Sequence, residues 1–417
     1  MPRHDKRPEG PPHPDPAAPL AARYRVVVFD CDGVLYLGDQ VIPAAPGAVE
    51  GVRKLGGHVG FMTNKSSTGP ADVAAKLTRL GIQAEPGDVV TSAQAIVRML
   101  GGPDALAGVK TVVIGGPGLC DELSRAGAHV LGAGGWREAE LVVVGFDPEL
   151  TFAKLADASL ALAVAGARFA ATNADPSLPG PDGPLPGAGS LLALLTTATG
   201  RRPEVAGKPA PALFETIAAR LGDGPYLMVG DRADTDLAGA AGLGWETALA
   251  LSGAVQPADL PDVPLLPTWV LLDAGGLLDP VPPAVRAPGW DELEAAGRLI
   301  DEVGPGADRL GLERTAVAVA ADGRVVGAVT WSAGDAEGDG GPGRLHGPVV
   351  EPDARGALVG TRLVMAACAG LRAASAGAVR ATGAGTGASR FLIRLGFVPD
   401  PGEPDILTRE LPEPSRL

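Results

Sequence analysis

Two periods of apolar residues alternate along the first half of the chain. The run at 26–29 is β-branched and aromatic, which predicts a strand buried on both faces of a parallel sheet. Apolar residues then recur at helical spacing over 49–55, a second strand is predicted at 59–63, and a second helix over 70–81. Such strand–helix units with short connections predict a doubly wound, Rossmann-like α/β core.

A second α/β set follows, between about residues 88 and 205. Strands are predicted at 110–114, 141–146 and 168–172, and helices at 152–165 and 190–199. The first pattern then resumes, with a helix near 210–221 and a strand at 226–230. This order predicts a core domain, 24–87 with 206–278, interrupted by an inserted α/β cap at 88–205.

The chain changes character at both ends. Residues 1–23 are polar and Pro-rich, and are expected to form a disordered extension. Proline is dense before 288, which places a linker at 279–288. An α+β domain is predicted over 289–412, with a helix near 293–300, a hairpin of strands 315–320 and 325–331, an acidic Gly-rich loop at 333–343, a strand at 345–350 and a helix from about 355.

Charge and cysteine content narrow the class of protein. The net charge is −14 over 417 residues, which argues against nucleic acid or an anionic membrane as the main partner. Three cysteines, at positions 31, 120 and 368, form no disulfide framework, so a reduced, cytoplasmic setting is expected. No stretch has the roughly 20 apolar residues that a spanning helix needs, so no membrane insertion is expected. An oligomer is compatible with all of this.

Polar side chains gather where the predicted core strands end. Asp30 and Asp32 follow the first strand, Thr63 and Asn64 the second, and Asp231 the strand at 226–230. Lys208 stands just before a helix, and Asp236 lies shortly after Asp231. The carboxyl ends of parallel strands are where open α/β sheets bind ligands. Each piece also has a plain interpretation as a turn, a surface lysine or a first-turn acid.

Together these residue types suit the cleavage of a phosphate ester. Asp30 can attack phosphorus and form an aspartyl-phosphate, while Asp32 can protonate the leaving alkoxide and later activate water. Asp30, Asp231 and the Asp32 carbonyl offer hard oxygen ligands for Mg²⁺. Thr63 and Lys208 can hold phosphate oxygens. The expected partner is a small phosphorylated metabolite.

The order Asp-x-Asp-Gly-Val, Thr-Asn, Lys and Gly-Asp-x(4)-Asp resembles the haloacid dehalogenase superfamily of phosphatases. The long insert after Asn64 and the segment 171–176, Ala-Thr-Asn-Ala-Asp-Pro, resemble its class IIA members. The resemblance covers roughly residues 24–280. It implies a Mg²⁺-dependent phosphomonoesterase with a mobile cap, in which Asp30 is the nucleophile and Asp32 is the acid/base. It also implies that the phosphate is bound by Thr63, Asn64 and Lys208. The metal would be bound by Asp30, Asp32 and Asp231, with Asp236 as a support.

The cap loop is expected to choose the substrate. It carries Asn173 and Asp175, short polar groups that are predicted to face the active site, although a Pro-rich surface loop is the plain alternative. The scarcity of aromatic residues in the cap favours a small hydrophilic leaving group. A chain of this two-domain design resembles actinobacterial glycerol 3-phosphate phosphatases, so glycerol 3-phosphate, in glycerophospholipid metabolism, is the first expected substrate. Phosphoglycolate, nitrophenyl-type, sugar and nucleotide phosphates are the alternatives.

The segment 349–363 resembles the acetyl-CoA loop of GNAT acyltransferases, in which amides at a helix N-terminus hold a pyrophosphate. Leu395-Gly396-Phe397 resembles the last motif of that fold. Two positions depart from the family: Leu358 stands where Gly is usual, and Leu392 where a Tyr acid is frequent. We therefore expect a GNAT-like domain that is structural or regulatory, with acetyl-CoA binding or acyl transfer, hence a bifunctional enzyme, as the alternative.

Overall fold

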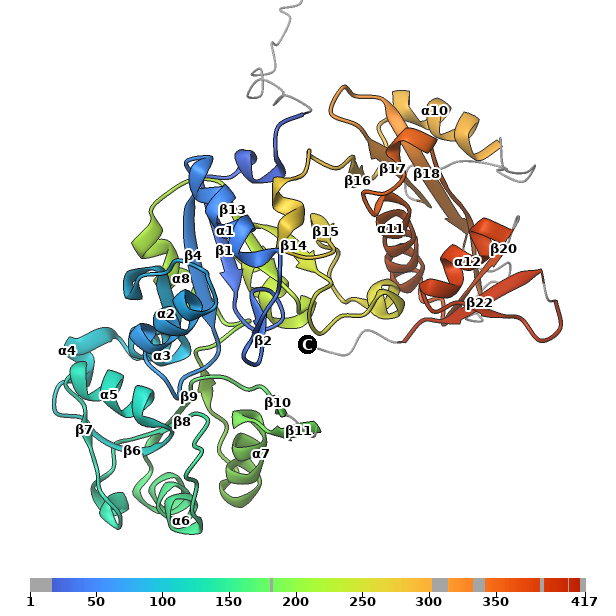
Figure 1. Cartoon of the computed structure of the whole chain (residues 1–417). Helices are drawn as coiled ribbons and strands as arrows, with labels where there is room; N and C mark the ends of the chain where they lie inside the picture. The colour runs from blue at the N-terminus through green and yellow to red at the C-terminus, as the bar shows by residue number, and fades with distance from the viewer. Residues whose placement is uncertain are drawn as a thin grey trace, which may run out of the picture. The chain divides into compact units, whose positions relative to one another are not determined.

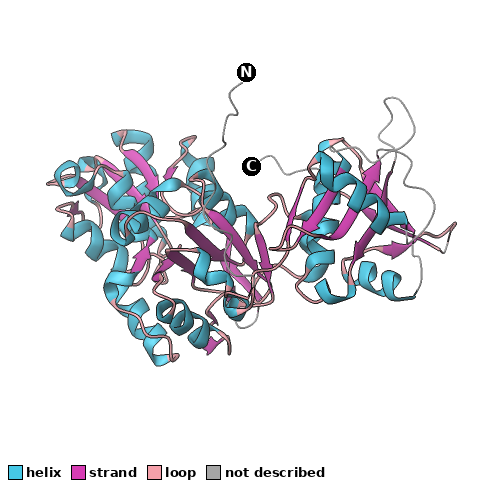
Figure 2. Ribbon diagram, turned by 90° about the horizontal axis from the view of Figure 1, so that it is seen from above, coloured by secondary structure: helices cyan, strands magenta, loops and turns pink. Residues whose placement is uncertain are grey.

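The computed structural model describes residues 17–180, 183–301, 314–332, 342–382, 386–403 and 405–412. The chain divides into two compact units, coloured along the sequence in Figure 1. The N-terminal unit comprises residues 24–230 and 235–247; the C-terminal unit comprises the described residues up to 23, 231–234, and those from 248 onward. Both units combine helices with strands (Figure 2). None of the helices in these residues is both long enough and apolar enough to cross a membrane.

A parallel sheet with the strand order β13-β1-β4-β5 forms the core of the N-terminal unit. Its strands are β1 (Val26–Asp30), β4 (His58–Thr63), β5 (Val89–Thr91) and β13 (Tyr226–Gly230). Every residue of β1 is buried, as expected for an apolar strand between two neighbours. The flanking helices are α1 (Ala45–Lys54), α2 (Pro70–Arg79), α3 (Ser92–Met99) and α8 (Pro211–Leu221). The predicted α/β core is confirmed.

The inserted segment forms a second parallel sheet, with the order β12-β9-β8-β6-β7. Its strands are β6 (Lys110–Ile114), β7 (His129–Val130), β8 (Leu141–Val144), β9 (Arg168–Ala171) and β12 (Glu204–Val205). Its helices are α4 (Gly102–Leu106), α5 (Pro117–Arg125), α6 (Phe152–Leu160), which continues as a π-helical turn at Ala161–Ala165, and α7 (Ala188–Thr199). The short hairpin β10 (Ser177–Gly180) and β11 (Gly183–Pro186) belongs to the cap loop.

The C-terminal unit contains a seven-stranded mixed sheet, ordered β16-β17-β18-β19-β20-β22-β21. Its strands are β16 (Ala284–Arg286), β17 (Thr315–Val319), β18 (Val325–Ser332), β19 (Gly343–Val350), β20 (Ala378–Thr382), β21 (Val398–Pro399) and β22 (Ile406–Glu410). All neighbours are antiparallel except β19 and β20, which are parallel. The predicted hairpin around Asp322-Gly323 is confirmed as β17–β18.

Two helices cover this sheet. Ala316 and Ala318 of β17 pack with Leu363 of α11 (Val359–Ala373), whereas Val317 and Val319 pack with Ala296 and Ile300 of α10 (Trp290–Asp301). Because neighbouring residues of a strand point to opposite faces, α10 and α11 lie on opposite faces of the sheet. The remaining helix, α12 (Thr386–Arg394), follows β20.

Arginines tie the C-terminal domain to the segment before it. Arg362 of α11 donates to the carbonyl oxygens of Pro283 at 2.8 Å and Thr268 at 2.7 Å. Arg372 of the same helix donates to the carbonyl of Val263 at 3.2 Å, and also to that of Pro261. Arg409 of β22 pairs with the carboxylate of Asp262. The same segment contains β15 (Trp269–Leu271), which pairs in parallel with β14 (Glu246–Ala250).

Three stretches differ from expectation or escape description. Leu20–Arg23, placed in a disordered extension, instead forms a short 3-10 helix with Leu20 fully buried, because Leu20 N–H bonds Asp279 and Arg23 lies over the Trp269 ring. The segment 284–286, within the expected linker, forms β16 at the sheet edge. Val89–Thr91, assigned to the cap, pairs with β4 in the core. Residues 1–16 and 333–341, predicted as extension and acidic loop, lie outside the described residues.

Candidate active site

Adjacent parallel strands bring three sequence-predicted segments to one edge of the core sheet. Asp30 is the last residue of β1 and pairs with Met62, one residue before Thr63 at the end of β4. On its other side β1 runs beside β13, with Phe29 opposite Val229. Asp231 follows the last residue of β13 directly in the chain. The order of the strands, and not any local signal, is what brings these polar residues to a common edge.

Lys208 supplies the cation of this edge. Its Nζ lies 2.5 Å from Oδ1 of Asp30 and 2.6 Å from Oδ1 of Asp236, and all three side chains are buried. Burial by itself would lower the pKa of Lys208, but the carboxylates of Asp236 and Asp30 outweigh it and raise the pKa above the usual lysine value. Lys208 therefore stays protonated, and its positive charge lies against the carboxylate of Asp30, the predicted nucleophile.

Asp236 reaches Lys208 because glycine precedes Asp231. A Cβ atom on Gly230 would lie 2.3 Å from Cβ of Asp236, so only glycine at the end of β13 leaves room for this carboxylate. Asp236 sits in a π-helical turn, Ala233–Leu237, and its side chain is 1% exposed. Such turns are frequent at functional sites.

Asp32 has a different environment from Asp30. Its residue is exposed, whereas Asp30 is buried, although the two are separated only by Cys31. Partial desolvation raises the pKa of the Asp32 carboxyl above its usual value, against the opposing effect of Lys76, Lys65 and Lys208. A carboxyl with a raised pKa is suited to give up a proton as a general acid.

Asn64 connects the core to the cap loop and to Lys208. Its Oδ1 accepts from the backbone N–H of Lys208 at 2.9 Å, and its Nδ2 donates to Oδ2 of Asp175 at 3.0 Å. The backbone carbonyl of Asn64 accepts from Nδ2 of Asn173 at 2.9 Å and from the Ser92 hydroxyl at 2.5 Å. The structure thus brings Asn173 and Asp175 to Asn64, as supports of the loop that carries Lys208.

Thr63 is also buried, and its hydroxyl accepts from the N–H of Lys65 at 3.1 Å, which closes a tight turn after β4.

The sequence did not predict several of the residues that support this site. Ser92 is one, and the hydroxyl pair of Thr172 and Ser66, 3.1 Å apart, is another. No local pattern singles out such serines, because their partners come from distant strand ends.

Asp231 is held from the C-terminal unit's own loop. Its Oδ2 accepts from the N–H of Ala254 at 2.8 Å. A Cβ atom on Gly253 would lie 2.1 Å from that oxygen, so the loop at 253–254 approaches Asp231 as closely as it does only with glycine. This loop carried no signal in the sequence.

The donor set fits Mg²⁺. The groups that the sequence assigns to the metal are the carboxylates of Asp30 and Asp231 and the backbone carbonyl of Asp32, all hard oxygen ligands of the kind that Mg²⁺ prefers. Cys31, which lies between Asp30 and Asp32 in the chain, is fully buried. Burial, together with the charges of Asp30 and Asp32, raises the pKa of its thiol well above the usual value. It remains a neutral thiol and not a soft thiolate ligand.

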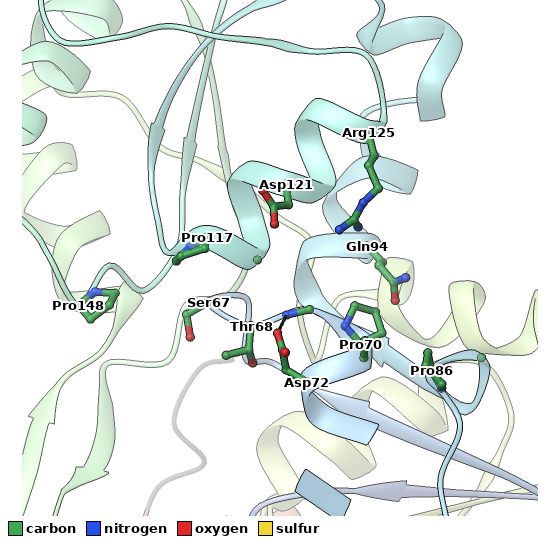
Figure 3. A pocket seen from close by; sticks show the side chains of 14 residues that line it. Ser67, Thr68, Pro70, Asp72, Pro86, Gln94, Pro117, Asp121, Arg125 and Pro148 are labelled. Atoms are coloured by element: carbon green, nitrogen blue, oxygen red, sulfur yellow. Dashed lines mark hydrogen bonds between the residues drawn. The ribbon is translucent and has the colours of Figure 1, made fainter. Parts of the chain in front are cut away.

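A cavity of about 860 Å³ lies elsewhere in the N-terminal unit (Figure 3). It is bounded by the loop at 67–69, by the first turn of α2 and by α5, with Asp121 and Arg125 on its wall. Its lining contains none of the predicted site residues. Gly118 packs against the backbone of Thr68, where a Cβ atom would lie 2.5 Å from the Thr68 carbonyl carbon. The cavity lies where the core segment at 67–72 and the cap helix α5 pack against each other. It does not include Asp30 or the other residues at that edge of the sheet.

Comparison with known proteins agrees with this geometry. A family model described as haloacid dehalogenase-like hydrolase matches residues 27–129, and a related model of HAD-like hydrolases matches 205–276. The D-glycerol 3-phosphate phosphatase of Mycobacterium tuberculosis is 38% identical over 56% of the chain; the match spans 65% of that relative, just under two thirds. Human chronophin is 38% identical over 56% of the chain and 83% of its own length.

The likeness extends further in three dimensions. The crystal structure of a glycerol phosphate phosphatase from Mycobacterium tuberculosis in complex with magnesium has a TM-score of 0.67 and is 29% identical. It covers 91% of this chain, and 99% of its own chain is matched. The match therefore extends beyond residue 276, where the second family model ends.

Proposed function

The chain belongs to the haloacid dehalogenase-like hydrolases as a phosphoric monoester hydrolase that uses Mg²⁺, and from this we propose that it hydrolyses a small phosphate monoester, glycerol 3-phosphate first. The observation that carries the proposal is the buried contact of Lys208 with Asp30 at 2.5 Å. A cation fixed at a carboxylate nucleophile is placed to neutralise an incoming phosphoryl group. An ordinary surface turn does not require a buried pair of a lysine and a carboxylate.

The residues divide the reaction between them. An oxygen of Asp30 attacks phosphorus, the bond from phosphorus to the ester oxygen breaks, and an aspartyl-phosphate forms. Asp32 gives its proton to the departing alkoxide and then takes one from the water that attacks the aspartyl-phosphate, which releases inorganic phosphate and restores Asp30. Lys208 and the Thr63 segment, including Asn64, hold phosphate oxygens.

Asp30, the backbone carbonyl of Asp32 and Asp231 would hold the Mg²⁺ ion, with Asp236 supporting them. Bound there, the ion neutralises charge on the phosphoryl group. The hard-oxygen donor set and the neutral thiol of Cys31 support this assignment.

Glycerol 3-phosphate is favoured over other esters by the extent of the likeness. The mycobacterial glycerol phosphate phosphatase structure matches over most of both chains, not over the hydrolase part alone. The polar cap-loop residues Asn173 and Asp175, tied to Asn64, suit a small hydrophilic leaving group better than a nucleobase. Among the alternatives, sugar phosphates are the second candidate, since a staphylococcal relative is named acid sugar phosphatase, 32% identical over 94% of its length.

For the C-terminal domain we propose a GNAT-like fold. Its mixed sheet, with one parallel pair, β19 and β20, beside the helix α11, supports this assignment. Leu358, at the N-terminal end of α11, has φ 54° and ψ 20°, the left-handed region that favours glycine. The backbone at the position where the family usually has glycine is thus one that glycine adopts readily, which supports CoA binding as a second candidate function, whereas the Leu358 side chain opposes it.

The Asp30→Asn variant tests the main proposal. We expect release of phosphate from glycerol 3-phosphate and nitrophenyl phosphate to fall to background, and EDTA to have the same effect on the unaltered enzyme until Mg²⁺ is restored. Asp39→Asn is the matched control, because the Asp39 side chain is fully exposed. If Asp30→Asn retains activity, the nucleophile is misassigned. A panel of phosphoglycolate and sugar phosphates then ranks the substrates by kcat/KM.

A further inference from the structure

Lys76 of α2 lies against the short hairpin that follows β1. The hairpin consists of two-residue strands, β2 (Tyr36–Leu37) and β3 (Gln40–Val41), joined by a turn of two residues. Nζ of Lys76 lies 3.9 Å from the centre of the Tyr36 ring and donates to the carbonyl oxygen of Gly38 at 2.7 Å. One ammonium group thus contacts both a strand and the turn of the hairpin.

The ring and the Gly38 carbonyl, and not the nearby carboxylate of Asp39, hold the ammonium group. The Lys76 side chain is 23% exposed and Tyr36 is buried, so the cation has lost much of its water where it meets the ring. A cation is attracted to the face of a tyrosine ring, and more strongly when it is desolvated. The ion pair of Lys76 with Asp39, at 3.6 Å, adds little because the Asp39 side chain is fully exposed.

Tyr36 closes the loop that carries Asp32. Its N–H donates to the carbonyl of Cys31 at 3.3 Å, and its carbonyl accepts from the N–H of Gly33 at 2.8 Å. Its hydroxyl donates to the thiol of Cys31. Because Cys31 and Gly33 are the two neighbours of Asp32 in the chain, the position of Tyr36 determines the position of the Asp32 backbone.

Asp32 depends on this loop for its position. Among the residues that the structure describes, no hydrogen bond holds the Asp32 carboxylate, whereas Lys208 contacts that of Asp30 at 2.5 Å. Lys76 also lies within electrostatic reach of Asp32: burial raises the pKa of the Asp32 carboxyl, and the charge of Lys76 is the foremost of those that oppose this rise. The Asp32 carboxyl is therefore placed by its backbone, and through Tyr36 by Lys76.

We propose that Lys76 is a positioning residue of the phosphatase reaction, which holds the hairpin against α2 and so keeps the Asp32 carboxyl where it can protonate the departing alkoxide. The inference rests on the proposed function, in which Asp32 is the acid. A proton passes only between groups at hydrogen-bond distance, so a small displacement of the acid is costly. Lys76 acts here through Tyr36 and not by contact with the substrate.

The first test compares two esters that differ in their need for an acid. Lys76→Met should lower kcat/KM for glycerol 3-phosphate about tenfold, and for nitrophenyl phosphate, whose leaving group departs without a proton, less than about threefold. Losses of equal size on both esters, or no loss on either, overturn the proposal. If the unaltered protein cleaves another alkyl phosphate in place of glycerol 3-phosphate, the proposed substrate alone is wrong, and that ester takes its place in the comparison. If it cleaves no phosphate ester, the proposed function itself fails.

Three further variants distinguish positioning from a general loss of structure. Lys76→Arg keeps a cation for the ring and a donor for the Gly38 carbonyl, and should restore kcat/KM for glycerol 3-phosphate to within about threefold of the unaltered protein. Lys76→Gln keeps a donor without the charge, and should show the same selective loss as Lys76→Met. Arg79→Met removes an exposed cation from the same helix and should change neither ester. Melting temperatures check that each variant is folded. Failure of Lys76→Arg to restore activity, or a selective loss in Arg79→Met, contradicts the proposal.

A double variant tests whether Lys76 acts through Asp32. In Asp32→Asn the acid is already absent, so adding Lys76→Met should lower kcat/KM for glycerol 3-phosphate no more than it does for nitrophenyl phosphate. The effects of the two changes are then not independent, as expected for residues that serve one step. If the selective loss persists in the Asp32→Asn background, Lys76 acts by another route and the proposal is wrong.

Discussion

The ammonium group of Lys208 lies 2.5 Å from the Asp30 carboxylate, and both side chains are buried. Lys208→Met leaves Asp30 and Asp236 facing each other without their cation. We expect this change to cost about 3 kcal/mol of unfolding free energy in the metal-free protein and to remove most of the activity. Chemical denaturation and phosphate release measure the two effects. Lys54→Met, at an exposed ion pair, should change stability by less than about 0.5 kcal/mol.

The same contact has a definite pH dependence. Because the pKa of Lys208 is raised in the folded protein, its contribution to stability is complete below the unfolded lysine value of about 10.4 and is lost only as the pH rises through the folded value. Between pH 6 and 9, Lys208 should therefore contribute a constant amount to the free energy of unfolding. The difference in that free energy between the unaltered protein and Lys208→Met should not change over this range. If this difference fell near pH 8, Lys208 would be losing its proton there, which would contradict the raised pKa.

Asp32 is tested by the leaving group. An alkoxide needs a proton on departure, whereas nitrophenolate leaves readily without one. Asp32→Asn should therefore lower kcat/KM for glycerol 3-phosphate by about 10² or more, and for nitrophenyl phosphate much less. Equal losses on both esters would assign Asp32 a role other than acid.

The raised pKa of Asp32 adds a pH signature. The protonated acid is lost as the pH rises through the folded value, so the alkaline limb of kcat/KM for glycerol 3-phosphate should lie above the pH expected for an ordinary aspartate. Asp32→Asn should remove that limb. The folded protein also binds this proton more tightly than the unfolded chain, so the contribution of Asp32 to stability is present at low pH and declines over the same range.

The bond from Asn64 to Asp175 can be tested by exchange. Asn64→Asp keeps the acceptor for Lys208 N–H but turns a carboxylate oxygen toward Asp175, and like charges should raise KM and lower kcat/KM about tenfold, or about 1.4 kcal/mol. Adding Asp175→Asn restores one donor and one acceptor, and should recover much of the loss. Absence of recovery in the double variant would show that the two side chains do not act through each other.

The side chain of Leu358 is expected to determine whether the proposed CoA site can bind acetyl-CoA. Leu358→Gly removes the side chain from a left-handed position, which should leave stability within about 1 kcal/mol and create measurable acetyl-CoA binding by calorimetry. Ser375→Gly is the matched control, because Ser375 has φ 61° at the other end of α11. If Leu358→Gly binds no acetyl-CoA, the loss of the glycine is not what separates this domain from CoA binding.

The sequence predicted the core best where the signal was local. The apolar run before Asp30 is diagnostic of a strand covered on both faces, and β1 is buried along its whole length. The hairpin at Asp322-Gly323 was predictable for a similar reason, since the two-residue turn specifies its own geometry. In both cases the residues that decide the structure are neighbours in the chain.

The rest depends on partners distant in sequence. The bonds of Asn64 reach residues 111 and 144 positions away, and no local pattern reports them. The strand β16 is hidden in a Pro-rich stretch, because a three-residue edge strand is fixed by its neighbour and not by its own propensity. Leu20–Arg23 has the composition of a disordered tail, but burial of Leu20 and the Trp269 ring order it.

The arginine bonds of the C-terminal domain have a consequence for any shortened form of the chain. Arg362, Arg372 and Arg409 bind backbone and side-chain groups at 261–268, a stretch that the hydrolase family model itself includes. An enzyme cut near position 288 would lose the cation beside Asp262 and the donors to four carbonyls, those of Pro261, Val263, Thr268 and Pro283. A shortened chain would therefore carry buried and half-buried polar groups without partners, so the C-terminal domain is part of what satisfies the hydrogen-bonding groups of the segment at 261–268.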